Sequence, residues 1–164
     1  MEIDLTQLRS RAQAEKKRWK KFFRKLSKRP PRDLDDQAGE LHEEVFQEID
    51  CLDCANCCKT TSPIFRDIDI ERLARHLGMR PAEFVEQYLH LDVEGDYVLT
   101  TAPCPFLGSD NYCSVYESRP RACREYPHTD RKNFHQILSL TLKNTEICPA
   151  AFEVVRRLEE RLNI

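Results

Sequence analysis

Four cysteines lie within eight residues of this chain, at Cys51, Cys54, Cys57 and Cys58. A Cys-x-x-Cys step lets two sulfur atoms from one tight turn reach the same ion, at about 2.3 Å from zinc. Crowded thiolates repel one another unless a cation offsets their charge, and bound metal also lowers the pKa of thiols. The run therefore predicts metal binding through thiolates. The alternative, cysteines that serve only as small buried apolar side chains, does not explain the spacing.

Four further cysteines follow along the chain, at Cys104, Cys113, Cys123 and Cys148. The first and the last adjoin a proline, and the third follows an Arg-Pro pair, so we expect irregular backbone around them. Such backbone offers both thiolates and free N–H groups to a metal cluster. The total of eight cysteines is twice the ligand count of a closed thiolate site. We therefore treat all eight as candidate metal ligands.

The spacing leaves the identity and the number of metals open. One possibility is that the chain forms two zinc sites with four thiolate ligands each, or one such site with the other cysteines unused. The other is iron, including a 4Fe-4S cluster held by four cysteines, although the spacing matches neither the bacterial nor the plant-type ferredoxin pattern. Adjacent Cys57 and Cys58 are awkward ligands for one ion. They fit better if they serve two metals, or if one of them is only a packed thiol.

Charged side chains near the distal cysteines are a second group of candidates. Arg119, Arg121 and Arg124 could offset the negative charge of a thiolate site, or they could form ordinary surface salt bridges. The histidines are scattered and none shows the spacing of a zinc finger. His128 is the best candidate for an accessory ligand, with a plain surface histidine as the alternative.

The composition indicates a mainly helical protein. The chain has 164 residues, of which 33% are charged, with four glycines against nine prolines. No apolar run reaches the ~20 residues of a membrane span, and the start of the chain lacks the apolar core of a signal peptide. We therefore expect a cytoplasmic location. In that reducing compartment many cysteines indicate metal or redox chemistry rather than disulfides.

The first 50 residues carry their charges in two opposite blocks. Residues 1–32 hold 12 Lys and Arg against 3 Asp and Glu, whereas residues 33–50 hold 8 Asp and Glu and no Lys or Arg. Apolar spacing predicts a helix over Ile3–Leu26, ended by the two prolines that follow, and a helix over Leu34–Ile49 with Asp33 as its N-cap. We predict a helical hairpin over residues 1–50, with opposite charges face to face, and a cysteine-cluster domain over residues 51–164.

The basic block has three interpretations. It is most simply a solvated helix face. A more specific interpretation is that it binds nucleic acid or an anionic membrane surface, because Trp19, Phe22 and Phe23 interleave with lysine and arginine. The acidic neighbour argues against both of these partners, since it neutralises the patch internally. The third interpretation is a protein partner that docks on the hairpin.

The rest of the chain predicts short elements separated by turns. Helices are expected at Asp67–Leu77, capped by Asp67 or Asp69 and stopped by Gly78, and at Pro81–Leu89. Tyr97–Thr101 reads as a short strand, and the alternation of leucines in Phe134–Leu142 slightly favours a strand. Cys148-Pro149 introduces a last helix that reaches Leu162. The predicted fold class is mainly α with irregular loops and at most a short β element, stapled by metal.

The whole set of motifs resembles a known family. Cys51-x-x-Cys54-x-x-Cys57-Cys58 is followed by Cys104-Pro-Phe-Leu, Cys113-Ser-Val-Tyr, Arg119-Pro-x-x-Cys123-Arg and Cys148-Pro. This series is similar to the YkgJ-type CxxCxxCC cysteine-cluster family of zinc- or iron-chelating domains. The resemblance implies that the eight cysteines, with Arg119, Pro120 and Arg124, belong to the family's pattern. It does not cover the charged N-terminal residues.

The resemblance implies two classes of function. The first is a module that binds zinc or iron through cysteine thiolates, for metal handling or as a structural interaction domain. The second is an iron–sulfur protein with a redox or enzymatic role, since the related flagellin lysine methylases carry a similar cysteine module linked to an iron–sulfur cluster. This chain has no glycine-rich fingerprint for a nucleotide or methyl-donor cofactor, which argues against methyl transfer.

Overall fold

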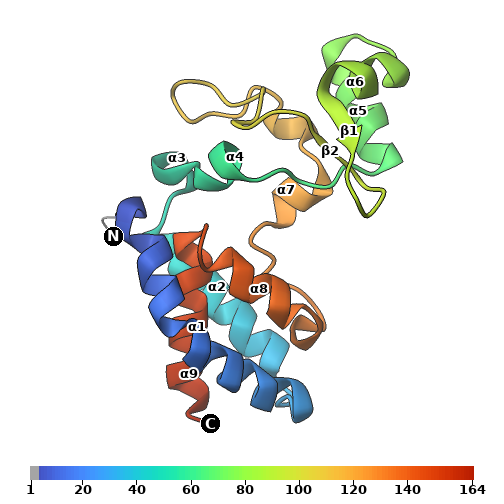
Figure 1. Ribbon diagram of the computed structural model, residues 1–164. Helices are drawn as coiled ribbons and strands as arrows, with labels where there is room; N and C mark the ends of the chain where they lie inside the picture. Colours follow the sequence, from blue (N-terminus) through green and yellow to red (C-terminus); the bar gives the residue numbers. More distant parts are fainter. Residues whose placement is uncertain (1–3) are drawn as a thin grey trace. The chain divides into compact units, whose positions relative to one another are not determined.

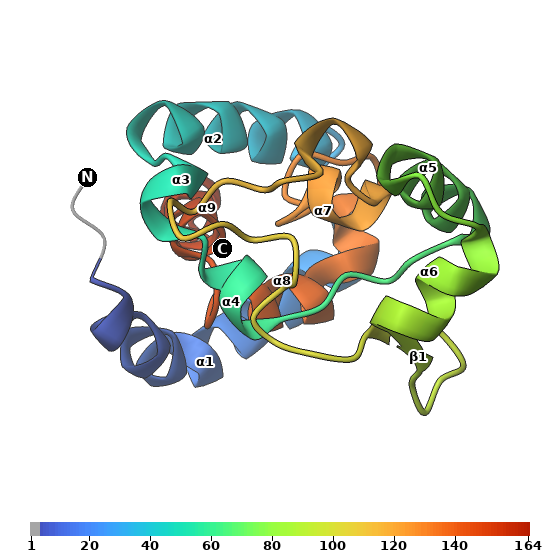
Figure 2. The same cartoon turned by 90° about the horizontal axis from the view of Figure 1, so that it is seen from above.

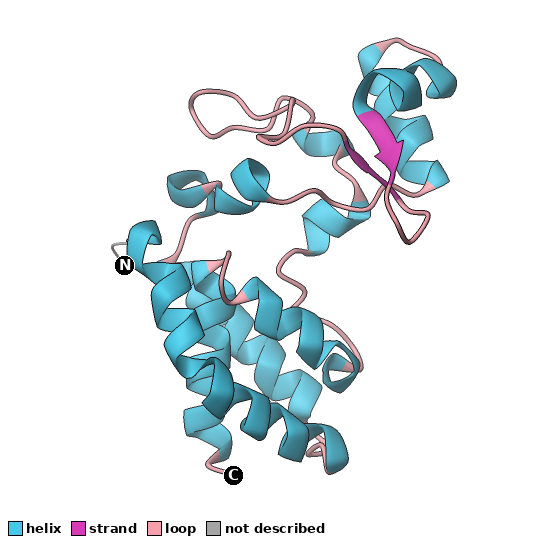
Figure 3. Cartoon of the chain, viewed as in Figure 1, coloured by secondary structure: helices cyan, strands magenta, loops and turns pink. Residues whose placement is uncertain are grey.

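The computed structural model describes residues 4–164 and confirms a mainly α protein (Figures 1 and 3). The two strands, β1 Leu89–Leu91 and β2 Tyr97–Leu99, form one antiparallel sheet. Single 3-10 turns lie at η1 Tyr116–Ser118 and η2 Phe134–Ile137. The helices are α1 Leu5–Lys28, α2 Leu34–Glu48, α3 Cys51–Cys54, α4 Asn56–Thr60, α5 Asp67–Leu77, α6 Pro81–Tyr88, α7 Arg121–Glu125, α8 Leu138–Asn144 and α9 Pro149–Leu162.

The chain divides into two compact units, which we describe separately. The first contains the described part of Met1–Cys54 together with Pro127–Ile164, and the second is Ala55–Tyr126. The first unit is therefore built from both ends of the chain. The division into residues 1–50 and 51–164, which we expect from the charge pattern, remains a prediction about which segments fold on their own.

The first unit is a helical assembly with α9 between α1 and α2 (Figure 2). Helix α1 begins at Leu5, where the Asp4 carboxylate caps it by accepting from the N–H of Thr6 at 3.0 Å. Ile3, with which we expected α1 to start, lies outside the described residues. The apolar stripe of α1 is buried, including Trp19, whose indole Nε1–H donates to Glu159 of α9 at 3.1 Å. Helix α9 thus covers both N-terminal helices.

The acidic helix α2 finds its basic partners on α9. In the described residues Arg157 forms a bidentate ion pair with Glu48, with N···O distances of 2.9 and 2.8 Å. Arg161 pairs with both Glu40 and Glu44, at 3.0 and 3.1 Å. We expected the charges of α2 to face the basic helix α1, and this was wrong. The reason is that α9 packs along α2 and carries its arginines on the face toward it. Asp33 does precede α2, but its side chain makes no capping hydrogen bond.

The segment Phe134–Leu142 is helical, so the strand favoured by its alternating leucines was wrong. It forms η2 followed directly by α8. Phe134, Leu138 and Leu142 are buried at intervals of four residues, as on one face of a helix, whereas Leu140 is 42% exposed. The alternation of leucines therefore gave a wrong prediction, because the buried apolar side chains of this segment recur every fourth residue, as in a helix, and not every second residue, as in a strand.

The second unit has its own apolar core, formed by α5, α6, the hairpin and the loops that follow. Helix α5 has the predicted bounds and ends at Gly78, whose φ of 68° is left-handed. Its N-cap is Arg66 rather than Asp67 or Asp69, because Asp69 reaches back from the third helical position to the Arg66 N–H. The strand predicted at Tyr97–Thr101 is shorter and pairs with β1, with Leu89 opposite Leu99.

None of the described helices combines the length and the apolar character needed to cross a membrane.

Candidate metal centre

The cysteine run folds as two short helices rather than one. Helix α3 ends at Cys54 and α4 starts at Asn56, with Ala55 between them in the left-handed conformation at a φ of 46°. Few residues other than glycine adopt this conformation, so the break is a specific local feature. Because of it, Cys51, Cys54 and Cys58 do not share one continuous helical face. The break also marks the boundary between the two units.

In the second unit the charge of Cys58 raises the pKa of three other thiols: Cys104, Cys113 and Cys123. Burial raises the pKa of the Cys123 thiol to about 12, and the charges of the other three raise it as well. Burial likewise raises the pKa of Cys104 and Cys113, and Cys58 contributes to both increases. The group draws on α4, the segment Cys104–Cys113 and α7. The backbone N–H of Cys104 donates to the carbonyl of Cys58 at 2.8 Å, which ties two of these segments together.

Backbone N–H groups near these sulfur atoms favour the thiolate form. Those of Phe106 and Leu107 lower the pKa of Cys104, and that of Val115 lowers the pKa of Cys113, against the larger effect of burial. Hydrogen bonds of this kind stabilise thiolates and tune metal clusters. The loop that supplies them is closed by a backbone hydrogen bond of 2.7 Å from Gly108 N–H to the Tyr112 carbonyl. The irregular backbone predicted around these cysteines therefore supplies donors to the site.

Cys58 differs from its neighbours in its pKa. A side-chain hydrogen bond with Cys57 lowers the pKa of Cys58 to about 7, against the effect of burial, and the charges of Arg119 and Lys59 lower it further. The adjacent pair Cys57 and Cys58 is thus connected, with Cys58 as the more acidic thiol. This makes Cys58 the thiol of the group that most readily becomes a ligand.

Of the three arginines proposed from the sequence, Arg119 acts on the thiols. Its charge lowers the pKa of Cys58, Cys113 and Cys123. The guanidinium lies 3.7 Å from the centroid of the Tyr116 ring and donates through Nε to the Tyr116 carbonyl at 3.0 Å, which fixes its position. Arg121 instead pairs with Glu125 at 2.6 Å. Arg124 is exposed at the end of α7.

A buried carboxylate, Asp69, holds the segment that leads into Cys123. Asp69 is 1% exposed and accepts from Arg72 Nη2 at 2.6 Å and from the backbone N–H of Arg121 at 3.1 Å. Arg72 also donates to the carbonyls of Ser118 and Arg119 at 3.3 and 2.8 Å. Burial alone would raise the pKa of Asp69, but hydrogen bonds from Arg66, Arg72 and Arg121 outweigh it and lower the pKa. Helix α5 therefore positions the Arg-Pro turn before α7.

Sequence reasoning missed this role of Asp69, because we considered that residue only as a helix cap. A clue was available: an aspartate followed three residues later by an arginine forms an ion pair on a helix surface. Nothing in the sequence reveals that the pair is buried against a segment about 50 residues further along the chain.

The first unit holds a separate group of three thiols: Cys51, Cys54 and Cys148. Burial raises the pKa of Cys148 to about 12, and the charges of Cys51 and Cys54 raise it as well. Cys148 is the N-cap of α9, where its sulfur accepts from the backbone N–H of Ala151 at 3.5 Å. A helix N-terminus favours a thiolate, so metal binding at Cys148 would be supported by α9.

His128 lies in the first unit with a left-handed φ of 65°. The residue before it, Pro127, accepts a hydrogen bond of 3.2 Å from the Asn144 side chain. A role of His128 as accessory ligand remains a prediction.

The second unit contains the ligand types of a thiolate site, namely four cysteines and a positive guanidinium that acts on them. In the described residues, however, the groups of three whose ligand atoms lie within 4.8 Å of one another contain no cysteine, so the sulfur atoms are not gathered as closely as bound metal would hold them. Because burial keeps most of these thiols neutral, metal binding there would release protons.

Comparison with known proteins agrees with this chemistry. The family CxxCxxCC, described as "Putative zinc- or iron-chelating domain", matches residues 50–149. The chain belongs to this CxxCxxCC family. The match includes all eight cysteines, and it supports metal binding by the protein. No curated protein and no solved structure matches the chain.

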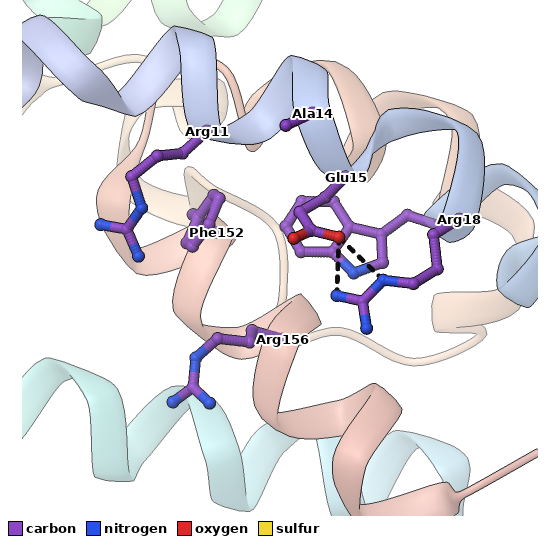
Figure 4. A pocket seen from close by; sticks show the side chains of 7 residues that line it. Arg11, Ala14, Glu15, Arg18, Phe152 and Arg156 are labelled. Atoms are coloured by element: carbon purple, nitrogen blue, oxygen red, sulfur yellow. Dashed lines mark hydrogen bonds and ion pairs between the residues drawn. The ribbon is translucent and has the colours of Figure 1, made fainter.

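The basic helix of this CxxCxxCC protein is partly neutralised within the first unit (Figure 4). A pocket of about 180 Å³ between α1 and α9 is lined by three arginines together with Ala14, Glu15, Trp19 and Phe152. Arg18 pairs with Glu15 at 2.7 Å, and Arg11 lies 4.8 Å from the centroid of the Phe152 ring. Arg18 also pairs with Glu159 of α9 at 3.2 Å, and Lys16 pairs with Glu146 at 2.7 Å. These contacts favour the interpretation of a solvated, internally paired helix face.

Proposed function

We propose that this protein binds zinc or iron in a four-thiolate site made by Cys58, Cys104, Cys113 and Cys123, and that the bound metal organises the second unit. The observation that carries the proposal is that the charge of Cys58 raises the pKa of Cys104, Cys113 and Cys123 within one compact unit, where a hydrogen bond of 2.8 Å also joins the N–H of Cys104 to the Cys58 carbonyl. A closed four-thiolate site has no open coordination position, so its role is structural or in metal handling. The module would then either hold a surface in the conformation that a partner protein binds, or store the metal.

The remaining cysteines are proposed as ligands as well. Cys51, Cys54 and Cys148 form a group of three thiols, and Cys57 is hydrogen-bonded to Cys58. Three protein ligands leave a position for an exchangeable group, as in catalytic zinc sites. If all eight cysteines take part in metal binding, they form two sites: one with four thiolate ligands and no open coordination position, and one with three protein ligands and a position for an exchangeable group.

A second candidate function is an iron–sulfur protein with a redox role. It is favoured by the backbone N–H groups that lower the pKa of Cys104 and Cys113, because N–H groups near the ligand sulfurs help to set the potential of iron–sulfur clusters. The guanidinium of Arg119 would offset the charge of such a cluster.

The test is anaerobic purification followed at once by a visible spectrum and analysis for zinc, iron and acid-labile sulfide. Zinc in a colourless protein supports the structural or metal-handling role. Iron with a matching amount of sulfide and visible charge-transfer absorption supports the redox role. A metal-free folded protein would contradict both.

Single cysteine variants assign the ligands. Cys104→Ser is expected to lose the metal of the four-thiolate site, whereas the matched control Cys51→Ser, in the other unit, is expected to keep it. Equal loss in both variants would contradict the proposed grouping of the thiols.

A further inference from the structure

A second set of metal-binding side chains lies in the first unit and contains no cysteine. His42 and Glu43 are on α2, and Asp130 is in the loop after α7. One ligand atom from each lies within 4.8 Å of the other two. His42 is half-buried and the two carboxylates are exposed. An imidazole nitrogen and carboxylate oxygens are suitable ligands for manganese, iron and zinc in the divalent state.

The imidazole of His42 is held by a buried hydroxyl. Its Nδ1 lies 2.8 Å from Oγ1 of Thr129, a residue with no exposed surface. The Phe46 ring lies beside the imidazole, with 4.5 Å between ring centroids. In metal sites the second ring nitrogen of a ligating histidine is held by such a partner, which fixes the ring and its tautomer. When Nδ1–H donates to Thr129, Nε2 keeps its lone pair for a metal.

The loop that supplies Thr129 and Asp130 is anchored at both ends within the same unit. At one end, Asn144 donates to the Pro127 carbonyl at 3.2 Å. At the other end, the backbone N–H groups of Asn133 and Phe134 donate to the Asp35 carboxylate of α2 at 2.7 and 3.0 Å. The orienting hydroxyl and one carboxylate ligand are therefore held against the helix that carries the other two ligands.

No lysine or arginine pairs with the two carboxylates of this cluster in the part of the chain that the structure describes. Glu43 and Asp130 form none of the ion pairs there, although the neighbouring acids Glu40, Glu44 and Glu48 all pair with arginines of α9. Two carboxylates this close repel each other unless a cation lies between them.

We propose that His42, Glu43 and Asp130 bind one divalent transition-metal ion of the manganese, iron and zinc class. The site is chemically distinct from the thiolate groups, because it offers nitrogen and oxygen instead of sulfur. Three protein ligands leave further coordination positions for water or a small anionic ligand.

The probe for this site is Mn²⁺, because manganese prefers oxygen and nitrogen ligands to thiolates. The protein, purified with any metal that it carries on its cysteines, is titrated with Mn²⁺ while electron paramagnetic resonance reports the free ion. One Mn²⁺ per chain is expected. Asp130→Asn and His42→Gln are each expected to weaken its binding by about tenfold or more.

Asp36→Asn is the matched control, because it removes the same charge from an exposed position of α2. It is expected to leave Mn²⁺ binding unchanged, as is Cys104→Ser in the other unit. Absence of Mn²⁺ binding, or equal weakening by Asp130→Asn and Asp36→Asn, would overturn the proposal. Loss of Mn²⁺ in Cys104→Ser would move the ion to the thiolate site and also overturn it. Since Asp130 is exposed, its variant tests the site without a loss of folding.

Discussion

At the scale of single residues, Asp69 connects the core of the second unit to the candidate metal centre. Its carboxylate accepts hydrogen bonds from α5 and from the backbone of Arg121, two residues before Cys123. A buried carboxylate needs hydrogen bonds or a charged partner, because a buried charge without them lowers the stability of the folded state. The position of Cys123 therefore depends on a residue that binds no metal.

We predict that Asp69→Asn lowers the free energy of unfolding by about 1–3 kcal/mol, since it breaks a charged hydrogen-bond network in a buried place. It is also expected to reduce the metal content of the purified protein. Urea unfolding and metal analysis measure the two effects. Asp67→Asn, an exposed neighbour on the same helix, is the control. Equal stability and metal content in both variants would contradict the role of Asp69.

The same residue predicts a dependence on pH. The folded state lowers the pKa of Asp69 below its ordinary value of 3.8. Its contribution to stability is therefore fully present above that value and is lost as the pH falls through the lower, folded pKa. The difference in unfolding free energy between the wild type and Asp69→Asn is expected to be constant near neutral pH and to shrink below the ordinary value. A difference that grows on acidification would contradict this assignment.

At the scale of elements, helix α2 combines three functions. It buries an apolar face, pairs its acids with α9, and carries two ligands of the proposed nitrogen–oxygen site. Its glycine is not required by any of them. A Cβ at Gly39 would lie 3.5 Å from Oδ1 of Asp130, which is ordinary van der Waals contact.

We predict that Gly39→Ala raises the free energy of unfolding by up to about 1 kcal/mol, because alanine loses less conformational freedom in a helix than glycine. Gly78→Ala is the contrasting variant. There φ is 68°, and a side chain is strained although the space is open, so the variant is expected to be destabilised. Thermal melting of the two variants measures both effects. A lower melting temperature for Gly39→Ala would show that the helix needs the glycine.

At the scale of the whole molecule, the cysteines are shared between two units. Each unit has an apolar cluster of its own, one on α1, α2, α8 and α9 and one on α5, α6 and the hairpin. Cys104 and Cys113 lie in loops of the second unit, and Cys123 lies in the short helix α7, so this region includes little regular structure. A metal held by these cysteines is therefore expected to stabilise the loops more than the helices of the first unit.

We predict that metal removal under anaerobic conditions exposes the backbone amides of residues 102–123 and leaves those of α1, α2 and α9 protected. Structural zinc contributes roughly 10–16 kcal/mol to the folding of small peptides, so the loss is expected to be large where the metal is bound. Hydrogen exchange followed by mass spectrometry measures the protection of each segment. Unchanged exchange in residues 102–123 would argue against a structural metal, and equal loss in both units would contradict their separate stabilities.

The sequence by itself determined the chemistry of the protein and most of its helices. The density of cysteines predicts a thiolate metal site without knowledge of the fold, because ligand identity and spacing limit which ions can bind. The bounds of α5 and α9 follow from local signals, namely Gly78 at one end and Cys148-Pro149 at the other. Such signals act through neighbouring residues and need no tertiary contact.

Only the tertiary structure decided which cysteines act together and where charges find their partners. The left-handed Ala55 separates Cys51 and Cys54 from Cys58, and the thiols whose pKa values they raise lie as far along the chain as Cys148 and Cys123. The helical state of residues 134–142 and the pairing of α2 with α9 likewise depend on what lies opposite each face. Local sequence cannot specify these choices, because burial and pairing depend on segments that are distant along the chain.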